Sequence, residues 1–162
     1  MTIEKKKLEK IILNYMESHN TVSLATERDR IPHAATVFYI NRGYKLFFLS
    51  SPSSRHGENM SNNPRVSATI NEDYDSWMSI KGIQLEGLVK EIGGILKNRQ
   101  IAKAYVKKYP GVEDFLFSPQ NLDSVIAKRI SKIRFYRLEP SRIYFLNNEW
   151  GFGQGEELEL FS

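Results

Sequence analysis

The sequence predicts a mainly β fold with flanking helices, built on a small antiparallel barrel with a Greek-key-like strand order. Three observations carry this prediction. Short segments rich in β-branched and aromatic residues follow one another closely between residues 21 and 92. Tight turns separate some of them, such as Asn41-Arg42-Gly43, where glycine suits a positive φ. A short helix-like segment interrupts the strands between residues 50 and 64, and closely spaced short strands are typical of small barrels.

Length and composition favour a single domain. The chain has 162 residues, of which 41% are hydrophobic, so it can bury a core of ordinary size. We expect one domain over residues 1–162, with a barrel core at 21–92 and a helical and C-terminal strand region at 96–162. The absence of cysteine excludes disulfides, thiolate zinc sites, iron–sulfur clusters and cysteine nucleophiles.

The N-terminus and the hydropathy pattern predict a cytoplasmic protein. The first residues are polar and rich in lysine, unlike a signal peptide. No apolar run approaches the roughly 20 residues that a membrane-spanning helix needs. We therefore expect no membrane association.

Charge is unevenly distributed along the chain. Residues 97–142 contain 11 Lys or Arg against 4 Asp or Glu, whereas the net charge of the whole chain is +4. Such a stretch can attract nucleic acid or a phosphorylated ligand, but a solvated helix face is the commoner cause of such a charge pattern. Its aromatic residues form no clear stacking platform, which makes nucleic-acid binding the least favoured function.

The first half of the chain gives a helix followed by strands. Residues 3–18 form an amphipathic helix, because Leu8, Ile11, Ile12 and Tyr15 recur at helical spacing. Pairing of the second strand is expected to start after Pro32, which cannot donate a ladder hydrogen bond. The expected strands are residues 21–26, 33–40, 44–49, 65–70 and 77–92, with a short helix ending before Pro64.

The second half alternates helices and strands. A basic helix is expected over residues 96–109, ended by Pro110-Gly111. Ser118-Pro119 has the chemistry of a helix start, which predicts a second helix to about residue 129. Two strands are expected at 133–138 and 142–146 on either side of Pro140, followed by a glycine-rich and acidic end.

The strongest local candidate for a binding site is the segment Ser50-Ser51-Pro52-Ser53-Ser54-Arg55-His56. It follows a strand and precedes a short helix, where free N–H groups favour an anion. Serine hydroxyls and histidine add donors, and arginine can hold phosphate oxygens in bidentate fashion. The same residues also suit an ordinary capped turn. No G-x-x-x-x-G-K-[ST] motif supports a nucleotide-hydrolysing P-loop.

Other candidates are weaker. The Gln84 amide offers a donor and an acceptor to a flat heterocycle, although an exposed strand residue is commoner. Trp150 lies between glycines and acidic residues, where it could stack over a ligand or dock on its own core. His33 and His56 could approach each other in space, but the histidine spacing predicts no metal site.

Several segments together resemble the FMN-binding split-barrel superfamily, the pyridoxamine 5'-phosphate oxidase-like proteins. The resemblance rests on TVSLAT, PHAATVFYI, KLFFLSSPSSRHGENMSNNPRVSATI and WMSIKGIQLEG. The serine and arginine run followed by NNPRVS is its most specific part. The C-terminal segment RFYRLEPSRIYFLNNEWGFG is similar to the YhbP-like proteins of bacteria.

The resemblance implies an FMN site and a homodimer. It implies that Thr36, Val37 and Phe38 line the flavin ring, that the strand end at Leu49 and Ser50 also contacts it, and that Gln84 approaches it across the dimer interface. The family's phosphate-binding Arg-Lys pair reads Arg55-His56 here, with Ser50 and Ser51 beside it. Two FMN molecules would lie at the interface. The remaining cofactor-binding candidate is Trp150.

The departures from the oxidases define the expected function. Basic residues that the oxidases carry on the second strand are replaced by Ala35 and Ile40, and their C-terminal substrate motif is absent. We therefore expect an FMN-dependent oxidoreductase or flavin reductase, acting on an unknown small substrate or NAD(P)H, and not a genuine pyridoxamine phosphate oxidase. The alternative is a non-catalytic module that binds or senses flavin or haem.

Overall fold

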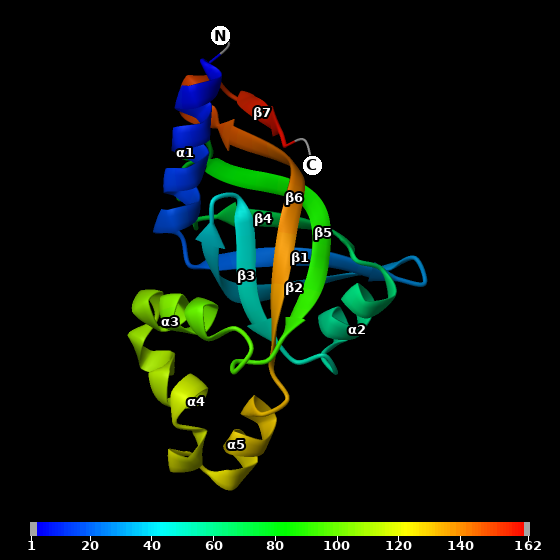
Figure 1. The fold of residues 1–162 in the computed structure, drawn as a ribbon. Helices are drawn as coiled ribbons and strands as arrows, with labels where there is room; N and C mark the ends of the chain where they lie inside the picture. Colours follow the sequence, from blue (N-terminus) through cyan, green and yellow to red (C-terminus); the bar gives the residue numbers. More distant parts are fainter. Residues whose placement is uncertain (1–2, 161–162) are drawn as a thin grey trace.

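The computed structural model describes residues 3–160, which form a β-barrel with helices around it (Figure 1). The α-helices are α1 (Lys5–Ser18), α2 (Arg55–Asn62), α3 (Arg99–Lys108), α4 (Glu113–Phe117) and α5 (Ser124–Ile130). The strands are β1 (Thr21–Arg28), β2 (Ile31–Arg42), β3 (Lys45–Ser50), β4 (Arg65–Asn71), β5 (Lys81–Gly93), β6 (Arg134–Asn147) and β7 (Gly155–Glu159). Four single 3-10 turns are η1 (Trp77–Ser79), η2 (Pro110–Val112), η3 (Pro119–Asn121) and η4 (Asn148–Trp150).

The strands close into an antiparallel barrel. Their order is β3-β2-β1-β4-β5-β6-β7, and an additional pairing of β3 with β6 joins the ends of the first six. β7 pairs with β6 outside this closed ring. The predicted class, a mainly β barrel with flanking helices, is confirmed. The barrel extends beyond residues 21–92, because β6 closes it after the helical segment.

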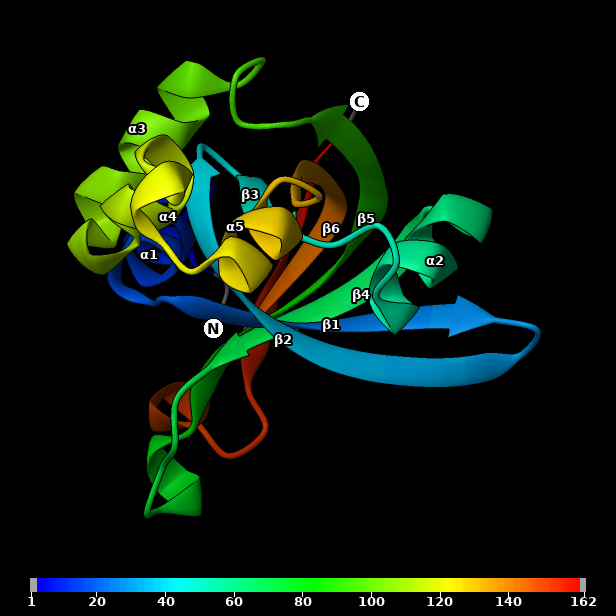
Figure 2. The same ribbon diagram turned by 90° about the horizontal axis from the view of Figure 1, so that it is seen from below.

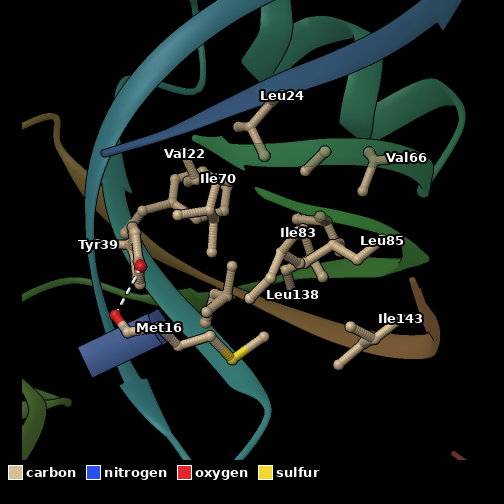
Figure 3. Packing of buried hydrophobic residues seen from close by; sticks show 14 of the residues in the cluster. Met16, Val22, Leu24, Tyr39, Val66, Ile70, Ile83, Leu85, Leu138 and Ile143 are labelled. Atoms are coloured by element: carbon tan, nitrogen blue, oxygen red, sulfur yellow. Dashed lines mark hydrogen bonds between the residues drawn. The ribbon is translucent and has the colours of Figure 1, made fainter. Parts of the chain in front are cut away.

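The main core fills the barrel, and α1 covers one opening. Side chains alternate along the strands, so that Leu24, Ile70 and Ile83 point inward and are buried (Figure 3). Met16 of α1 is buried against them, and the Tyr39 hydroxyl donates a 2.6 Å hydrogen bond to its backbone carbonyl. The predicted amphipathic helix is therefore confirmed, and it is fixed to the barrel by both packing and this hydrogen bond.

A second hydrophobic cluster joins α3 and α4 to the barrel. Phe47 of β3, Tyr105 of α3, Leu116 of α4 and Phe135 of β6 are buried together. In Figure 1, α3, α4 and α5 lie together below the barrel, while α2 lies to the right of its lower part. The two helical regions therefore occupy different parts of the barrel surface.

The hairpin between β1 and β2 is longer than expected. Pro32 pairs with Glu27 inside the ladder, so the prediction that pairing starts after Pro32 is wrong. Proline is tolerated because β3 pairs only with residues 39–42 of β2, which leaves this part of β2 at a sheet edge. Asp29 and Arg30 have positive φ and make the tight turn.

β6 is one strand, although two were expected around Pro140. Pro140 lies opposite Gly87, where a register shift between Glu86 and Gly87 bends the ladder. A Cβ at Gly87 would lie 2.3 Å from the Glu139 carbonyl oxygen, so only glycine lets the two backbones approach there. The bulge accommodates Pro140, so β6 continues through it as one strand.

Other boundaries differ near the helices and the C-terminus. The helix expected from residue 118 is a 3-10 turn followed by α5. Asp123 caps the start of α5, because its side chain accepts a 2.8 Å hydrogen bond from the Val125 N–H. The long fifth strand starts at Lys81, because residues 77–79 form a 3-10 turn. α4 and β7 were not expected. None of the helices among residues 3–160 is long and apolar enough to cross a bilayer.

Candidate functional site

The predicted anion-binding segment is a structured turn between β3 and α2. We call residues 50–54 the serine loop. The Ser54 hydroxyl caps α2, because it accepts a 3.1 Å hydrogen bond from the Gly57 N–H and donates a 2.7 Å bond to the Ser51 carbonyl. The capped-turn interpretation is therefore correct, and this turn also fixes the positions of the polar groups around it.

Gly57 lets the helix start lie directly on the serine loop. A Cβ at this position would lie 2.4 Å from the Ser51 carbonyl oxygen and 2.9 Å from that of Pro52. Both neighbours are backbone atoms, which cannot rotate away as the end of a side chain can. The conformation of the loop therefore depends on this close approach.

Unused donors surround the start of α2. The Ser54 hydroxyl accepts a hydrogen bond from the Gly57 N–H, and its backbone carbonyl accepts one from the Glu58 N–H. The N–H groups of Arg55 and His56 have no acceptor among residues 3–160. Arg55 is exposed and forms no ion pair within that range. Because these groups are positive or partly positive, this end of the helix favours an anion.

His56 is held in a different environment from its neighbour. Its Nε2 is in hydrogen-bond contact with the hydroxyl of buried Ser50, and its ring lies parallel to that of His33, with 6.4 Å between centroids. Burial lowers the pKa of His56 below its usual value, and the nearby His33 lowers it further. His56 is therefore a neutral donor or acceptor near pH 7, while Arg55 supplies the positive charge.

The candidate residues of β2 and β3 lie next to the serine loop. The pairing of Tyr39 with Phe48 brings the preceding part of β2 to the end of β3. Val37 is half-buried against the main core, and Leu49 is half-buried against the second cluster. Thr36 and Phe38 face outward, and Phe38 is 55% exposed. The structure thus brings the β2 candidates together with Leu49, Ser50, Ser51, Arg55 and His56.

Gln84 lies on the outer face of the same sheet but far from the serine loop. The strand registers place Thr36, Ser23, Thr69, Gln84 and Tyr144 in one row across five strands. At the usual strand spacing, Gln84 is ~14 Å from Thr36. A hollow of about 620 Å³ lies over this outer face, and Ser23, Thr69, Gln84 and Tyr144 line it.

Trp150 belongs to a separate aromatic cluster. Its ring lies 5.6 Å from that of Phe145, while Trp77 and Phe152 form an edge contact at 5.4 Å. Asn148 ties the two segments together by donating to the carbonyls of Trp77 and Ile80. In Figure 2, these segments lie on the opposite side of the molecule from α2. Within one chain, Trp150 and the serine loop do not form one site.

Sequence reasoning missed the small residues of the outer face. Ser67 and Thr69 of β4 line the hollow with Ala25 of β1, and each is exposed. The strict alternation of buried and exposed residues in β4 is the signal that could have found them. No cluster of three or more potential metal ligands occurs among the described residues.

Comparison with known proteins places the chain among the split-barrel proteins. Residues 8–147 match the pyridoxamine 5'-phosphate oxidase family. A UPF0306 protein of Klebsiella pneumoniae is 24% identical over 142 residues, which cover 86% of this chain and 85% of the relative. A UPF0306 protein of Photorhabdus laumondii is 30% identical over 103 residues, which cover 62% of this chain and 71% of the relative.

Solved structures share the fold at low sequence identity. A putative pyridoxamine 5'-phosphate oxidase of Listeria innocua has a TM-score of 0.64 at 24% identity, covering 86% of this chain and 98% of its own. The haem storage protein HutZ of Vibrio cholerae has a TM-score of 0.64 at 19% identity, covering 82% and 89%. A haem-binding protein of Mycobacterium smegmatis has a TM-score of 0.69 at 17% identity, covering 98% and 60%.

The family match spans most of the chain, from α1 to the end of β6, and the barrel is the one that these solved structures share. The chain belongs to the pyridoxamine 5'-phosphate oxidase family.

Proposed function

We propose that this protein binds FMN as a homodimer and uses it for electron transfer in the cytoplasm. The observation that carries the proposal is the serine loop, where exposed Arg55 and two free N–H groups meet at the start of α2. A phosphate group suits these donors, because its oxygens accept several hydrogen bonds and its negative charge is matched by the guanidinium. The neighbouring Ser51 and Ser53 hydroxyls, 2.9 Å apart, add further donors.

The unpaired edge of β2 supports a place for the flavin ring. Residues before Tyr39 have β1 on one side and no strand on the other. The Phe38 carbonyl accepts a 3.0 Å hydrogen bond from the Tyr105 hydroxyl. The other backbone N–H and C=O groups on the free side are available to a flat heterocycle with donors and acceptors at its rim. This edge runs from Val37 toward the serine loop, as a ring attached to a bound phosphate requires.

The outer sheet face supports the dimer. Its row of small polar side chains contains Thr36, Ser23 and Thr69, and two large apolar side chains, Phe38 and Leu88, are more than half exposed near it. Gln84 is ~14 Å from Thr36 in one chain, and a second copy would bring it closer to the proposed ring. A dimer packed through this face would unite the β2 edge of one copy with Gln84 of the other.

Bound FMN would supply the capacity to accept and donate electrons, with NAD(P)H or another small molecule as its partner. The chain's own residues would bind and orient it: Arg55 and the serine loop at the phosphate, Thr36 to Phe38 along the ring. Ala35 and Ile40 carry no charge to hold a phosphorylated pyridoxal substrate. The proposed activity is therefore not pyridoxamine phosphate oxidation.

Haem binding is the second candidate, and two observations favour it. Two proteins with the same fold are named for haem storage or haem binding. In this chain, the parallel rings of His33 and His56 stand 6.4 Å apart beside the candidate site. A non-catalytic module that stores or senses haem or flavin would have this same barrel.

A titration with FMN and riboflavin tests the phosphate site directly. Arg55→Ala should weaken FMN binding roughly 10- to 100-fold, the equivalent of about 1.5–3 kcal/mol for a charge-assisted hydrogen bond. Riboflavin, which lacks the phosphate, should bind the wild type and Arg55→Ala equally. Flavin fluorescence quenching measures both affinities.

Arg129→Ala is the matched control, because Arg129 is an exposed arginine on α5, away from the serine loop. It should bind FMN as the wild type does. An Arg55→Ala protein with unchanged FMN affinity would show that the serine loop does not hold the phosphate.

A further inference from the structure

A second hollow, of about 630 Å³, lies between the barrel and the helical region. The segment that follows β5 forms one side of it, at residues 94–99. Residues of α4, η3 and α5 and the segment 131–134 at the start of β6 form the rest, and these helices lie below the barrel in Figure 1. Its volume is in the usual range for a small-molecule site.

The wall of this hollow is apolar and largely preformed. Leu116 and Ile130 are buried, while Ile95 and Phe117 are partly buried against the second hydrophobic cluster. Leu96, at the mouth, is 85% exposed. An apolar ligand body would cover the lining without requiring the helices to separate.

All charged side chains that line the hollow are basic. They are Lys97, Arg99 and Arg134, and no Asp or Glu is among the lining residues. Arg134 is fixed in place, because its Nη1 donates 3.0 Å hydrogen bonds to the carbonyls of Ser131 and Ile133. Its Nε lies 3.9 Å from Glu91, a distant and partly exposed contact that neutralises it only weakly. A guanidinium has five N–H donors, so donors remain for a ligand.

We propose that this hollow binds a small amphipathic anion, with an apolar body against the wall and a carboxylate paired to the three basic side chains. The apolar wall favours an apolar ligand body, and the three cations add affinity for a negative charge at its end. No residue lines both this hollow and the serine loop. The proposal therefore does not depend on the binding of FMN.

The test compares octanoate with 1-octanol, which have the same chain length and differ in charge. Titration of ¹⁵N-labelled protein should shift the amide signals of residues 94–99, α5 and 131–134. Octanoate should bind at least about tenfold more tightly than 1-octanol, as a charge-assisted pair adds affinity.

Three variants separate the contributions. Ala127→Phe, which places a ring in the hollow, should abolish binding of both compounds. Arg134→Gln should weaken octanoate about tenfold and leave 1-octanol unchanged. Arg99 is exposed, so Arg99→Gln provides the same test if Arg134→Gln does not fold. Lys103→Gln, an exposed charge of α3 outside the lining, should change neither affinity.

The proposal is overturned if octanoate binds no better than 1-octanol or if its shifts lie elsewhere in the protein. Displacement of octanoate by saturating FMN would also overturn it, because the two ligands would then share one site.

Discussion

Arg55 and His56 are adjacent in the chain, but their surroundings give them different charges. Arg55 is an exposed guanidinium, whereas burial and the nearby His33 lower the pKa of His56. The lysine that the family resemblance leads one to expect at position 56 is thus replaced by a neutral ring near pH 7. The phosphate affinity should therefore depend mainly on Arg55.

The lowered pKa of His56 predicts a loss of stability on acidification. Between the folded and unfolded pKa values, the unfolded chain binds more protons, so the free energy of unfolding falls as pH decreases below about 6.5. His56→Gln removes this contribution and should lose less stability than the wild type between pH 7 and pH 5. Urea unfolding at both pH values measures the stability that each protein loses. The carboxylates that both proteins share contribute equally, so they cancel when the two losses are compared. Equal losses in the two proteins would contradict a partly buried, neutral His56.

The chemical types of the site residues could be predicted from the sequence, but their contacts and separations in space could not. The Ser-Arg-His run indicates an anion site because its donors are visible in the sequence. The need for glycine at position 57 was not visible, because it arises from the carbonyls of Ser51 and Pro52. The separation of Gln84 from Arg55 depends on strand order, which local pattern does not determine.

At the scale of elements, the contact of α2 with the serine loop gives a sharp prediction. Gly57→Ala places a Cβ against two backbone carbonyls and should lower the free energy of unfolding by about 1–3 kcal/mol, as overpacking does. It should also weaken FMN binding, because the loop must shift. Gly111→Ala is the control, since nothing lies within 4 Å of its added Cβ. Urea unfolding and FMN titration of both variants measure these effects. If Gly57→Ala and Gly111→Ala behave alike, the close contact of Gly57 with the serine loop is contradicted.

Element types followed from the sequence more reliably than element ends. α1 and β4 have clear periodicity, and both lie close to their expected ranges, as does β3. Pro32 and Pro140 predict breaks in the strands, yet a sheet edge accommodates Pro32 and a bulge at Gly87 accommodates Pro140. β7 is not predictable from local pattern because it is short and acidic, and Leu158 is its one buried side chain.

The whole molecule is predicted to dimerise through its outer sheet face. Thr69→Lys places a charge in the centre of the polar row and should convert the dimer to monomers with reduced FMN affinity, because the charge would be desolvated at the interface. Sedimentation equilibrium measures the mass. Asn14→Lys, which adds the same charge to an exposed position of α1, should remain dimeric. A monomeric wild type, or a dimeric Thr69→Lys protein, would contradict this assembly.

The closure of the barrel could not be derived from local patterns. β3 pairs with β6, although α2 to α5 and two strands intervene in the chain. Such pairing depends on packing across the whole molecule, so only the resemblance of several segments to a known family indicated the complete fold. The second hollow went unnoticed for the same reason, since its wall comes from β6, the helices and the 94–99 segment.

The visible absorption spectrum of freshly purified protein, with identification of the ligand released on denaturation, tests the central claim most directly. FMN binding predicts a flavin spectrum and released FMN. A Soret band would contradict it in favour of haem, and a colourless protein that takes up no added FMN would contradict the flavoprotein proposal altogether.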